Sequence, residues 1–405
     1  MASFPRRALT NVGGKVLVEL GNARDKDLLR HALDVRADDP DLMSHVHGFH
    51  AYPARLHPIT ARRLLTGLTR PGDCVLDPFC GSGTVLVEAL LQGRIAVGLD
   101  ANPLAVMLAS YKLKRTTPAD LECLLAGAKV VAQDAEARRI ARAGATRRYP
   151  ADQASQFDPH VLLELDGLQS SIRKVKDAQC QAGLLLVLSA IANKVSRQTS
   201  DTATRPNQRR WASGYVIKFF YKKTQELVQR QAEFSQQFQD DPIQMPDIRV
   251  GDAQKLPFKS NSVAAIVSSP PYPGIYDYVE HHRLRLQWLG LNTNYLQQHE
   301  IGAKRQARGR DAQQFRRNYN AQLGRCLSEM ARVLRQAGTI ALIVADSVID
   351  ARAWFADEEI DYLSAQAGLC LVATASQIRP HFHKPTEQAF GRRSRSERLL
   401  LLRRK

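Results

Sequence analysis

The sequence predicts an α/β protein with a mostly parallel, twisted sheet, helices on both faces and one helical insertion. Three observations predict this class: an apolar run leading into a glycine-rich turn and a helix, a second apolar run ending in an acid, and later apolar runs alternating with helical patterns. The chain has 405 residues and is 44% hydrophobic, which is enough for a core. At roughly 100–200 residues per domain, this length fits two or three domains or one large fold with an insertion.

The first predicted unit is a strand, a glycine loop, a helix and a second strand. The apolar run Cys74–Asp77 predicts a strand that enters the glycine-rich stretch 78–84. Residues 85–91 then carry apolar side chains at helical spacing. A further apolar run, 95–99, ends in Asp100. This order is typical of the opening of a nucleotide-binding α/β sheet.

The α/β alternation resumes late in the chain. Further apolar runs predict strands at 248–251, 263–267, 339–345, 370–375 and 399–402. Helical patterns lie among them at 315–334 and 353–367. Residues 116–246 are instead rich in Gln, Ala and Arg, with helical periodicity at 161–195 and 215–238. We interpret them as a helical insertion between the second and third strands, because a structureless loop of that length would be improbable.

The composition argues against several classes of protein. The first ten residues have no apolar run behind their arginines, unlike a secretory signal, and the longest apolar stretches, 183–192 and 337–345, are about half of what a spanning helix needs. We therefore expect a cytoplasmic protein with no membrane partner. The six cysteines form no C-x-x-C pair, and the adjacent His281 and His282 point apart on a helix, so no metal site is expected.

The positive charge is concentrated in a few segments. The chain carries a net charge of +17, and the segments 138–148, 194–223, 304–317 and 392–405 together hold 26 basic and 3 acidic residues. A uniformly solvated basic surface would not show this segregation. The pattern therefore predicts a nucleic-acid partner, which rewards Lys and Arg through phosphate contacts.

The glycine-rich stretch 78–84 has the features of a ligand-binding loop. Gly81 and Gly83 let the backbone pass close to a ligand, and the following helix N-terminus offers unpaired N–H groups. A P-loop would need a lysine before Thr84, so phosphate hydrolysis is disfavoured. Asp100 stands at the end of the next strand, where such folds hold a ribose diol. The alternative interpretation is a tight structural turn.

Ser269-Pro-Pro-Tyr272 follows directly on a predicted strand. Ligands of open α/β sheets bind in the crevice outside the carboxyl ends of the strands. The consecutive prolines fix the backbone and remove N–H donors, which leaves carbonyl oxygens as rigid acceptors. Such a site suits a substrate with an exocyclic amino group, and Tyr272 offers a face on which a base could stack. The alternative is a simple strand-terminating turn.

Together, Asp77-Pro-Phe-Cys-Gly-Ser-Gly-Thr84 and Ser269-Pro-Pro-Tyr272 resemble the motifs of the amino-group DNA methyltransferases. These enzymes transfer a methyl group from S-adenosyl-L-methionine to cytosine N4 or adenine N6. The resemblance implies a Rossmann-like class I methyltransferase fold with S-adenosyl-L-methionine as cofactor. It divides the chain into an N-terminal extension, a cofactor-binding half, a helical insertion that is a candidate for target recognition, and a catalytic half with a basic C-terminal tail, at 1–48, 49–115, 116–246 and 247–405.

The resemblance also implies roles for individual residues. The cofactor-binding set is Asp77, Pro78, Phe79, Cys80, Gly81, Ser82, Gly83, Thr84, Asp100 and Asp252. The catalytic set is Ser269, Pro270, Pro271 and Tyr272. Candidates for binding the substrate are Tyr276, Arg197, Arg209 and Trp211. Residues 49–55 loosely match an N-terminal cofactor-contacting motif. The Ser269 hydroxyl and the Pro270 carbonyl would accept the N–H bonds of the target amine, and Tyr272 would stack on the flipped base.

Several alternatives remain open for the substrate. With Ser rather than Asp or Asn at position 269, the motif resembles the cytosine-N4 subgroup more than the adenine-N6 subgroup, which implies cytosine N4 as the favoured target. An RNA (tRNA) guanine-N2 methyltransferase, which usually has Asp at that position, is the main alternative, although no RNA-binding module is recognisable in residues 1–47. A non-catalytic nucleic-acid-binding protein with the same fold is more remote. Methylation at cytosine C5 is not expected, because none of the six cysteines follows a proline in a strand-end loop.

Overall fold

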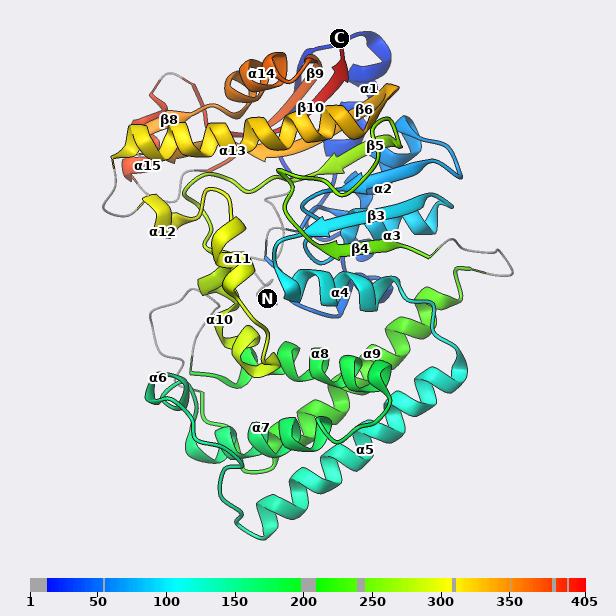
Figure 1. Ribbon diagram of the computed structural model, residues 1–405, viewed down its shortest axis with the longest axis vertical. Coiled ribbons are helices and arrows are strands. Elements are labelled where there is room, and N and C mark those ends of the chain that lie inside the picture. The colour runs from blue at the N-terminus through cyan, green and yellow to red at the C-terminus, as the bar shows by residue number, and fades with distance from the viewer. Residues whose placement is uncertain are drawn as a thin grey trace.

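The computed structural model describes residues 13–53, 55–197, 209–238, 245–307, 311–349, 351–380, 384–391 and 393–405. Its central sheet contains β1 (Val16–Leu20), β2 (Cys74–Asp77), β3 (Ile95–Asp100), β4 (Asp247–Val250), β5 (Val263–Ser268), β6 (Leu334–Ala345), β9 (Leu369–Ile378) and β10 (Ser396–Arg404). The spatial order of these eight strands is β1-β9-β10-β6-β5-β2-β3-β4 (Figure 1). A separate short ribbon pairs β7 (Ser347–Ile349) with β8 (Arg352–Trp354).

Most of the sheet is parallel. The neighbouring strands β4, β3, β2, β5 and β6 all run in one direction. Strand β10 lies antiparallel between β6 and β9, and β1 pairs antiparallel with the outer edge of β9. The predicted mostly parallel α/β sheet is therefore confirmed. Because β2, β3, β4 and β5 are parallel, their carboxyl ends meet at one edge, where ligands of such sheets bind.

Helices cover both faces of the sheet. They are α1 (Ala23–Leu33), α2 (Pro58–Leu68), α3 (Thr84–Leu91), α4 (Pro103–Leu113), α13 (Ala312–Val333) and α14 (Ala356–Gln366). Leu76 and Ile266 face a core shared with α13 and α14, whereas their neighbours Val75 and Val267 face a second core shared with α1, α2 and α3. Successive side chains of a strand point to opposite faces, so near-continuous apolar runs are required where both faces are buried.

The helical insertion lies between α4 and β4 in the chain. It contains α5 (Pro118–Ile140), α6 (Ala151–Ala154), α7 (Pro159–Ile172), α8 (Ala178–Val195) and α9 (Tyr215–Ser235). In Figure 1, α5, α7, α8 and α9 form a layer below the sheet, with α4 between the two. They share a core of their own, to which the second half of the chain contributes Leu284, Leu286 and Trp288 of α10 (Tyr278–Leu289).

Helix α8 is long and apolar enough to cross a membrane by length and composition alone. However, 61% of it is buried within the protein, and Leu184, Leu188 and Ile191 are fully buried in the core of the insertion. A core helix passes the same length and composition test, so this single helix is weak support for a membrane span.

The remaining elements show where the sequence patterns fell short. The short helices η1 (Pro40–Met43), η2 (His45–Gly48), α11 (Asn294–His299), α12 (Lys304–Ala307) and α15 (Lys384–Phe390) were not predicted. The helix predicted at 353–367 was wrong over its first residues, which belong to β8. The extension 1–48 contributes β1 and α1 to the main sheet layer, and Asp25 of α1 forms a two-bonded ion pair with Arg403 of β10. The pairing of β1 with β9 joins strands that are far apart in the sequence, and local periodicity does not reveal such contacts.

Candidate active site

The glycine loop joins β2 to α3 with two residues in the left-handed backbone region. Gly81 has φ of +50° and Gly83, which precedes the first residue of α3, has φ of +82°. A Cβ added at Gly83 would lie 2.9 Å from the Ala109 Cβ of α4, a distance that real Cβ atoms do not tolerate. Glycine at position 83 is thus required both by the turn and by the contact between α3 and α4.

Asp100 links the end of β3 to this loop. Its carboxylate accepts hydrogen bonds from the backbone N–H of Gly81 and of Asn102, each at 2.8 Å. The Asn102 side chain in turn caps the N-terminus of α4 and donates to the Tyr52 hydroxyl. Burial raises the pKa of Asp100 to about 6. The carboxylate therefore positions the loop while its remaining lone pairs are available to donors on a ligand.

Asp77 connects the glycine loop with the second motif. It is buried at the end of β2 and accepts hydrogen bonds from the Ser268 hydroxyl at 2.6 Å and the Phe79 N–H at 3.1 Å. Burial raises the pKa of Asp77 to about 7, and the nearby Asp100 carboxylate adds to the shift. Because Ser268 immediately precedes Ser269, this bond fixes the start of the Ser-Pro-Pro-Tyr loop relative to the glycine loop.

Both motif loops line one pocket at the carboxyl edge of the sheet. The predicted site residues that line it are Asp77, Pro78, Phe79, Cys80, Gly81, Ser82, Thr84, Asp100, Asp252, Ser269 and Pro271. Gly83, Pro270 and Tyr272 are not among the lining residues. The Asp252 carboxylate, just after β4, accepts from the backbone and side-chain amides of Gln254. The structure thus brings together the ends of β2, β3, β4 and β5 around a single cavity.

Other lining residues were not singled out individually by the sequence patterns. Tyr52 and Arg55 come from the loosely matched segment 49–55, and Tyr278 and Glu300 come from the α10–α11 region. The Arg55 side chain donates to the His47 carbonyl, but among the described residues neither its buried Nε–H nor the buried Ser82 hydroxyl has a hydrogen-bond partner. Buried polar groups normally have partners, so these two groups fit a ligand that presents acceptor oxygens.

The Ser-Pro-Pro-Tyr loop is held by bonds from neighbouring elements. The Tyr319 hydroxyl of α13 donates to the Pro271 carbonyl at 2.8 Å, so that carbonyl already has a donor. The Ser269 Oγ lies 3.3 Å from the Tyr272 hydroxyl, which itself lies 3.3 Å from a carboxylate oxygen of Glu397. Tyr272 is only 8% exposed. Stacking of a base on its ring therefore remains a prediction, which requires the loop to open toward the substrate.

The predicted substrate-binding residues are not part of the lining of this pocket, although Tyr276 packs against the lining residue Tyr278. Tyr276 packs against Tyr272 and Tyr278, with ring centroids 6.5 and 5.6 Å away. Arg197 forms an ion pair with Asp158 at 2.7 Å, Trp211 stacks on Tyr215 with centroids 4.6 Å apart, and Arg209 is exposed. None of the four predicted residues lines the pocket. Residues 198–208, which make up the whole stretch between Arg197 and Arg209, lie outside the described residues.

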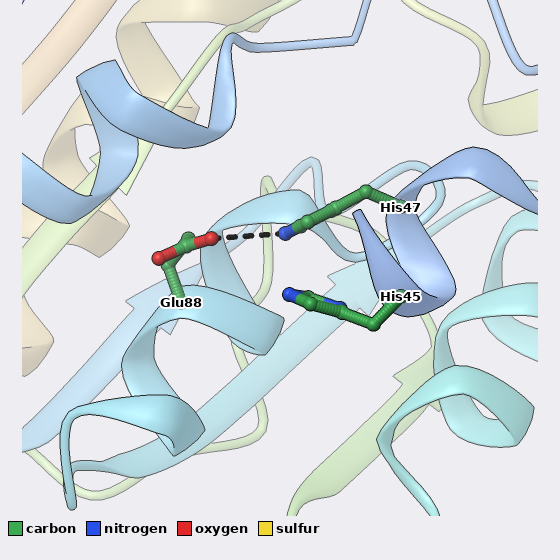
Figure 2. A group of neighbouring side chains, drawn as sticks. All are labelled: His45, His47 and Glu88. Carbon is green, nitrogen blue, oxygen red and sulfur yellow. Dashed lines mark hydrogen bonds and ion pairs between the residues drawn. The ribbon is translucent and has the colours of Figure 1, made fainter. Parts of the chain in front are cut away.

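A second cluster of polar side chains brings His45 and His47 of η2 beside Glu88 of α3 (Figure 2). His47 and Glu88 are buried, and His45 is partly buried. Their ligand atoms lie within 4.8 Å of one another, whereas two ligands of a tetrahedral zinc ion are about 3.3 Å apart. Glu88 accepts from His47 Nε2 at 2.9 Å and from Arg62 Nε at 2.8 Å. Burial lowers the pKa of both histidines, to about 4 for His45. The cluster therefore fits a hydrogen-bonded link between the N-terminal segment and α3 better than a metal centre.

The chain is similar in sequence to several methyltransferases. A family model described as DNA methylase matches residues 32–110. The chain is 25% identical over 269 residues to the Type II methyltransferase M.MvaI of Kocuria varians, covering 61% of this chain and 58% of that one. It is 34% identical over 97 residues to the Type II methyltransferase M.MjaII of Methanocaldococcus jannaschii, covering 24% and 18%. It is 47% identical over 51 residues to the tRNA (guanine(10)-N2)-dimethyltransferase of Methanothermobacter thermautotrophicus, covering 12% and 15%.

These matches confirm the resemblance to the amino-group methyltransferases that the two motifs indicated. The sheet order agrees with the Rossmann-like class I methyltransferase fold implied by that resemblance. The chain spans less than two thirds of the length of each of these relatives. The family match contains the glycine loop and Asp100 and ends well before Ser269. The family match therefore covers the predicted cofactor-binding segment and does not reach the Ser-Pro-Pro-Tyr loop.

Proposed function

We propose that this chain, which resembles the DNA methylases, transfers a methyl group from S-adenosyl-L-methionine to an exocyclic amino group of a base in DNA. The observation that carries the proposal is the meeting of the two motif loops in one pocket. The glycine loop and Ser269 both line it, and the Asp77–Ser268 bond couples them. A nucleotide-binding loop alone would fit many activities, and the second loop narrows the choice to chemistry on a donor-bearing amine.

The pocket residues fit the chemical groups of the proposed cofactor. Asp100 would accept from the ribose hydroxyls, and Asp252 from the adenine amino group. The unpartnered donors of Arg55 and Ser82 suit the carboxylate of the methionine part. Bound S-adenosyl-L-methionine supplies a methyl group that its sulfonium has already activated, so the protein mainly positions the acceptor.

On the substrate side, the loop supplies hydrogen-bond acceptors rather than a strong base. The Ser269 hydroxyl and the Pro270 carbonyl would accept the two N–H bonds of the target amine. Such bonds favour a pyramidal nitrogen, whose lone pair then faces the methyl group. A general base before transfer is unnecessary, because the proton can leave afterwards from the cationic product. Serine at position 269 supports cytosine N4 over adenine N6 as the target.

A second candidate function is methylation of guanine N2 in RNA. The similarity of a short segment to a tRNA (guanine(10)-N2)-dimethyltransferase favours it, because that protein also acts on an exocyclic amine. The matched stretch covers only 12% of this chain, whereas the Type II methyltransferase match covers 61%. DNA therefore remains the proposed substrate.

Nucleoside analysis distinguishes the two functions. DNA and RNA from cells expressing the chain would be digested separately, and the modified nucleosides identified by mass spectrometry against cells without it. The proposal expects new N4-methylcytosine in DNA. N6-methyladenine in DNA would correct the target atom and keep the reaction class, whereas N2-methylguanine confined to RNA would replace the proposed function.

A further inference from the structure

A line of polar atoms runs from the Ser-Pro-Pro-Tyr loop into the antiparallel strand β10. It passes from Ser269 Oγ to Tyr272 Oη over 3.3 Å, and from Tyr272 Oη to Glu397 Oε1 over 3.3 Å. The other carboxylate oxygen, Glu397 Oε2, accepts from the Arg379 guanidinium, with Nε at 3.1 Å. Hydrogen bonds of this length are common in catalytic sites before the substrate binds and tighten afterwards.

Glu397 and Arg379 are both buried, with 4% of each residue exposed. Burial raises the pKa of Glu397, and the Arg379 guanidinium opposes that shift. Arg379 is held in turn by Gln377, whose side-chain oxygen accepts from it at 3.0 Å. A buried ion pair is costly to form, and hydrophobic residues of the same volume would often be as stable. The position of this pair beside the catalytic loop therefore calls for a role other than stability.

The ion pair fixes the direction of the hydrogen bonds. An ionised carboxylate can only accept, so the Tyr272 hydroxyl must donate to Glu397. The Tyr272 oxygen is then free to accept, and the Ser269 hydroxyl donates to it. As a result the lone pairs of Ser269 Oγ are turned away from Tyr272 and toward the pocket that Ser269 lines. A serine hydroxyl can otherwise serve as donor or acceptor with equal ease.

We propose that Glu397 is a positioning residue that fixes Ser269 Oγ as a hydrogen-bond acceptor for the target amine. The inference rests on the proposed function. A carboxylate or amide oxygen at position 269 would accept a hydrogen bond in any orientation. A neutral serine hydroxyl can also donate, so it needs a neighbour that fixes the direction of its proton. Glu397 acts through Tyr272 and does not touch the substrate, so it sets which bases the pocket accepts: those that present an amino group rather than a carbonyl.

The substitution Glu397→Gln tests the proposal by reversing this direction. Arg379 requires an acceptor, so the new amide turns its oxygen toward Arg379 and its NH₂ group toward Tyr272. Tyr272 must then donate to Ser269, whose own proton points at the target amine. We expect kcat for methyl transfer to fall by about tenfold or more, as for a lost transition-state hydrogen bond. The calorimetric Kd for S-adenosyl-L-methionine should stay within about twofold, since Glu397 does not line the pocket.

A binding measurement gives a readout independent of turnover. Two oligonucleotide duplexes are used, one with the methylated site found by nucleoside mapping and one with uracil in place of cytosine, or hypoxanthine in place of adenine, at the target. Their affinities are measured by fluorescence anisotropy with S-adenosylhomocysteine present. The unmodified chain should favour the amino-bearing base. Glu397→Gln should lose or reverse that preference, and any effect of the mismatch cancels because both proteins see the same two duplexes.

Two controls separate positioning from stability. Asp346→Asn breaks the buried Asp346–Arg398 pair, whose Arg398 neighbours Glu397 on the same strand, and should lower the melting temperature while keeping the base preference. Tyr272→Phe removes the hydroxyl that links Glu397 to Ser269, and it should weaken the preference for the amino-bearing base without reversing it. This variant keeps the proposal testable if Glu397→Gln does not fold. An unchanged preference in folded Glu397→Gln overturns the proposal. Absence of any methyl transfer by the unmodified chain would instead count against the proposed function.

Discussion

The carboxyl edge of the sheet and the helical insertion differ in how their polar residues are arranged. At the sheet edge, residues from four strand ends converge on one pocket, and Asp77 and Asp100 are held there by hydrogen bonds despite the cost of burial. On the insertion, the predicted substrate residues do not converge on a pocket: Arg209 is exposed, Arg197 is paired with Asp158, and Trp211 packs against Tyr215. The carboxyl edge of the sheet thus gathers its polar residues into one pocket, whereas the insertion does not, and a role of the insertion in recognition stays a prediction.

The largest expected effect is at the glycine loop. Gly83→Ala adds a Cβ that would lie 2.9 Å from Ala109 and forces a strained φ, so we expect the loop to shift and S-adenosyl-L-methionine binding to fall by about a hundredfold or more. Gly72→Ala is the matched control, because Gly72 has φ of +83° but open space around it and lies outside the pocket. Calorimetry should find near-normal affinity for the control. Equal affinity for both variants would show that the loop does not hold the cofactor.

Features set by local sequence were predicted, whereas features set by contacts between distant segments were not. The strands β2, β3 and β5 and the loops after them were predicted because apolar runs, glycines and prolines act locally along the chain. Tyr52 and Arg55 lie in the segment 49–55, which matched a cofactor-contacting motif only loosely. The contact of Glu397 with Tyr272 was not predicted, because it depends on strand pairing over a long sequence distance. The single helical pattern at 161–195 became α7 and α8, since a period alone does not locate the break between two antiparallel helices.

The next effect concerns the catalytic loop. Ser269→Ala removes the proposed acceptor while leaving the glycine loop intact, so kcat should fall by about ten- to a hundredfold with little change in cofactor affinity. Single-turnover transfer of a labelled methyl group, measured with saturating cofactor, checks this expectation. A variant that loses cofactor affinity and keeps its rate would place Ser269 on the cofactor rather than on the amine.

If Asp77 and Asp100 hold the cofactor as proposed, its binding should depend on pH. Asp100 and Asp77 have pKa values raised to about 6 and about 7, and a cationic sulfonium favours their ionised forms. Cofactor affinity should therefore rise between about pH 5.5 and pH 7.5 and level off above, because the folded carboxylates lose their protons there. The cofactor-free protein should show the opposite trend in stability. Unfolded aspartate ionises near about 3.9, so stability falls as pH rises from there toward 7.

Asp77→Asn provides the control for this trend. It should flatten the dependence of the melting temperature on pH and weaken cofactor binding at neutral pH. Calorimetry and thermal melting over the same pH series measure both. A wild-type affinity that stays constant from about pH 5.5 to 7.5 would contradict a role for these carboxylates in holding the cation.

The smallest expected effect is on the insertion. Lys218 and Lys222 are exposed on α9 beside Tyr215, in one of the basic segments that predicted a nucleic-acid partner. Lys222→Glu should weaken DNA binding by a few fold, more at low salt than at high salt, and leave cofactor affinity unchanged. Lys259→Glu is the control, because Lys259 is also exposed but precedes the amino end of β5, whereas the pocket lies at the carboxyl ends of the strands. If both substitutions weaken DNA binding equally in anisotropy titrations, the net charge of the protein, and not a specific surface on α9, determines the affinity.

The glycine loop and the Ser-Pro-Pro-Tyr loop, which the sequence predicts independently, are proposed to form one site for methyl transfer to an amino group. The most direct measurement incubates the purified chain with deuterated-methyl S-adenosyl-L-methionine and unmethylated DNA, followed by nucleoside mass spectrometry, with Gly83→Ala and Ser269→Ala alongside. The account predicts labelled N4-methylcytosine, or N6-methyladenine, from the unmodified chain and a strong reduction in both variants. Label at cytosine C5, or undiminished transfer by both variants, would contradict it.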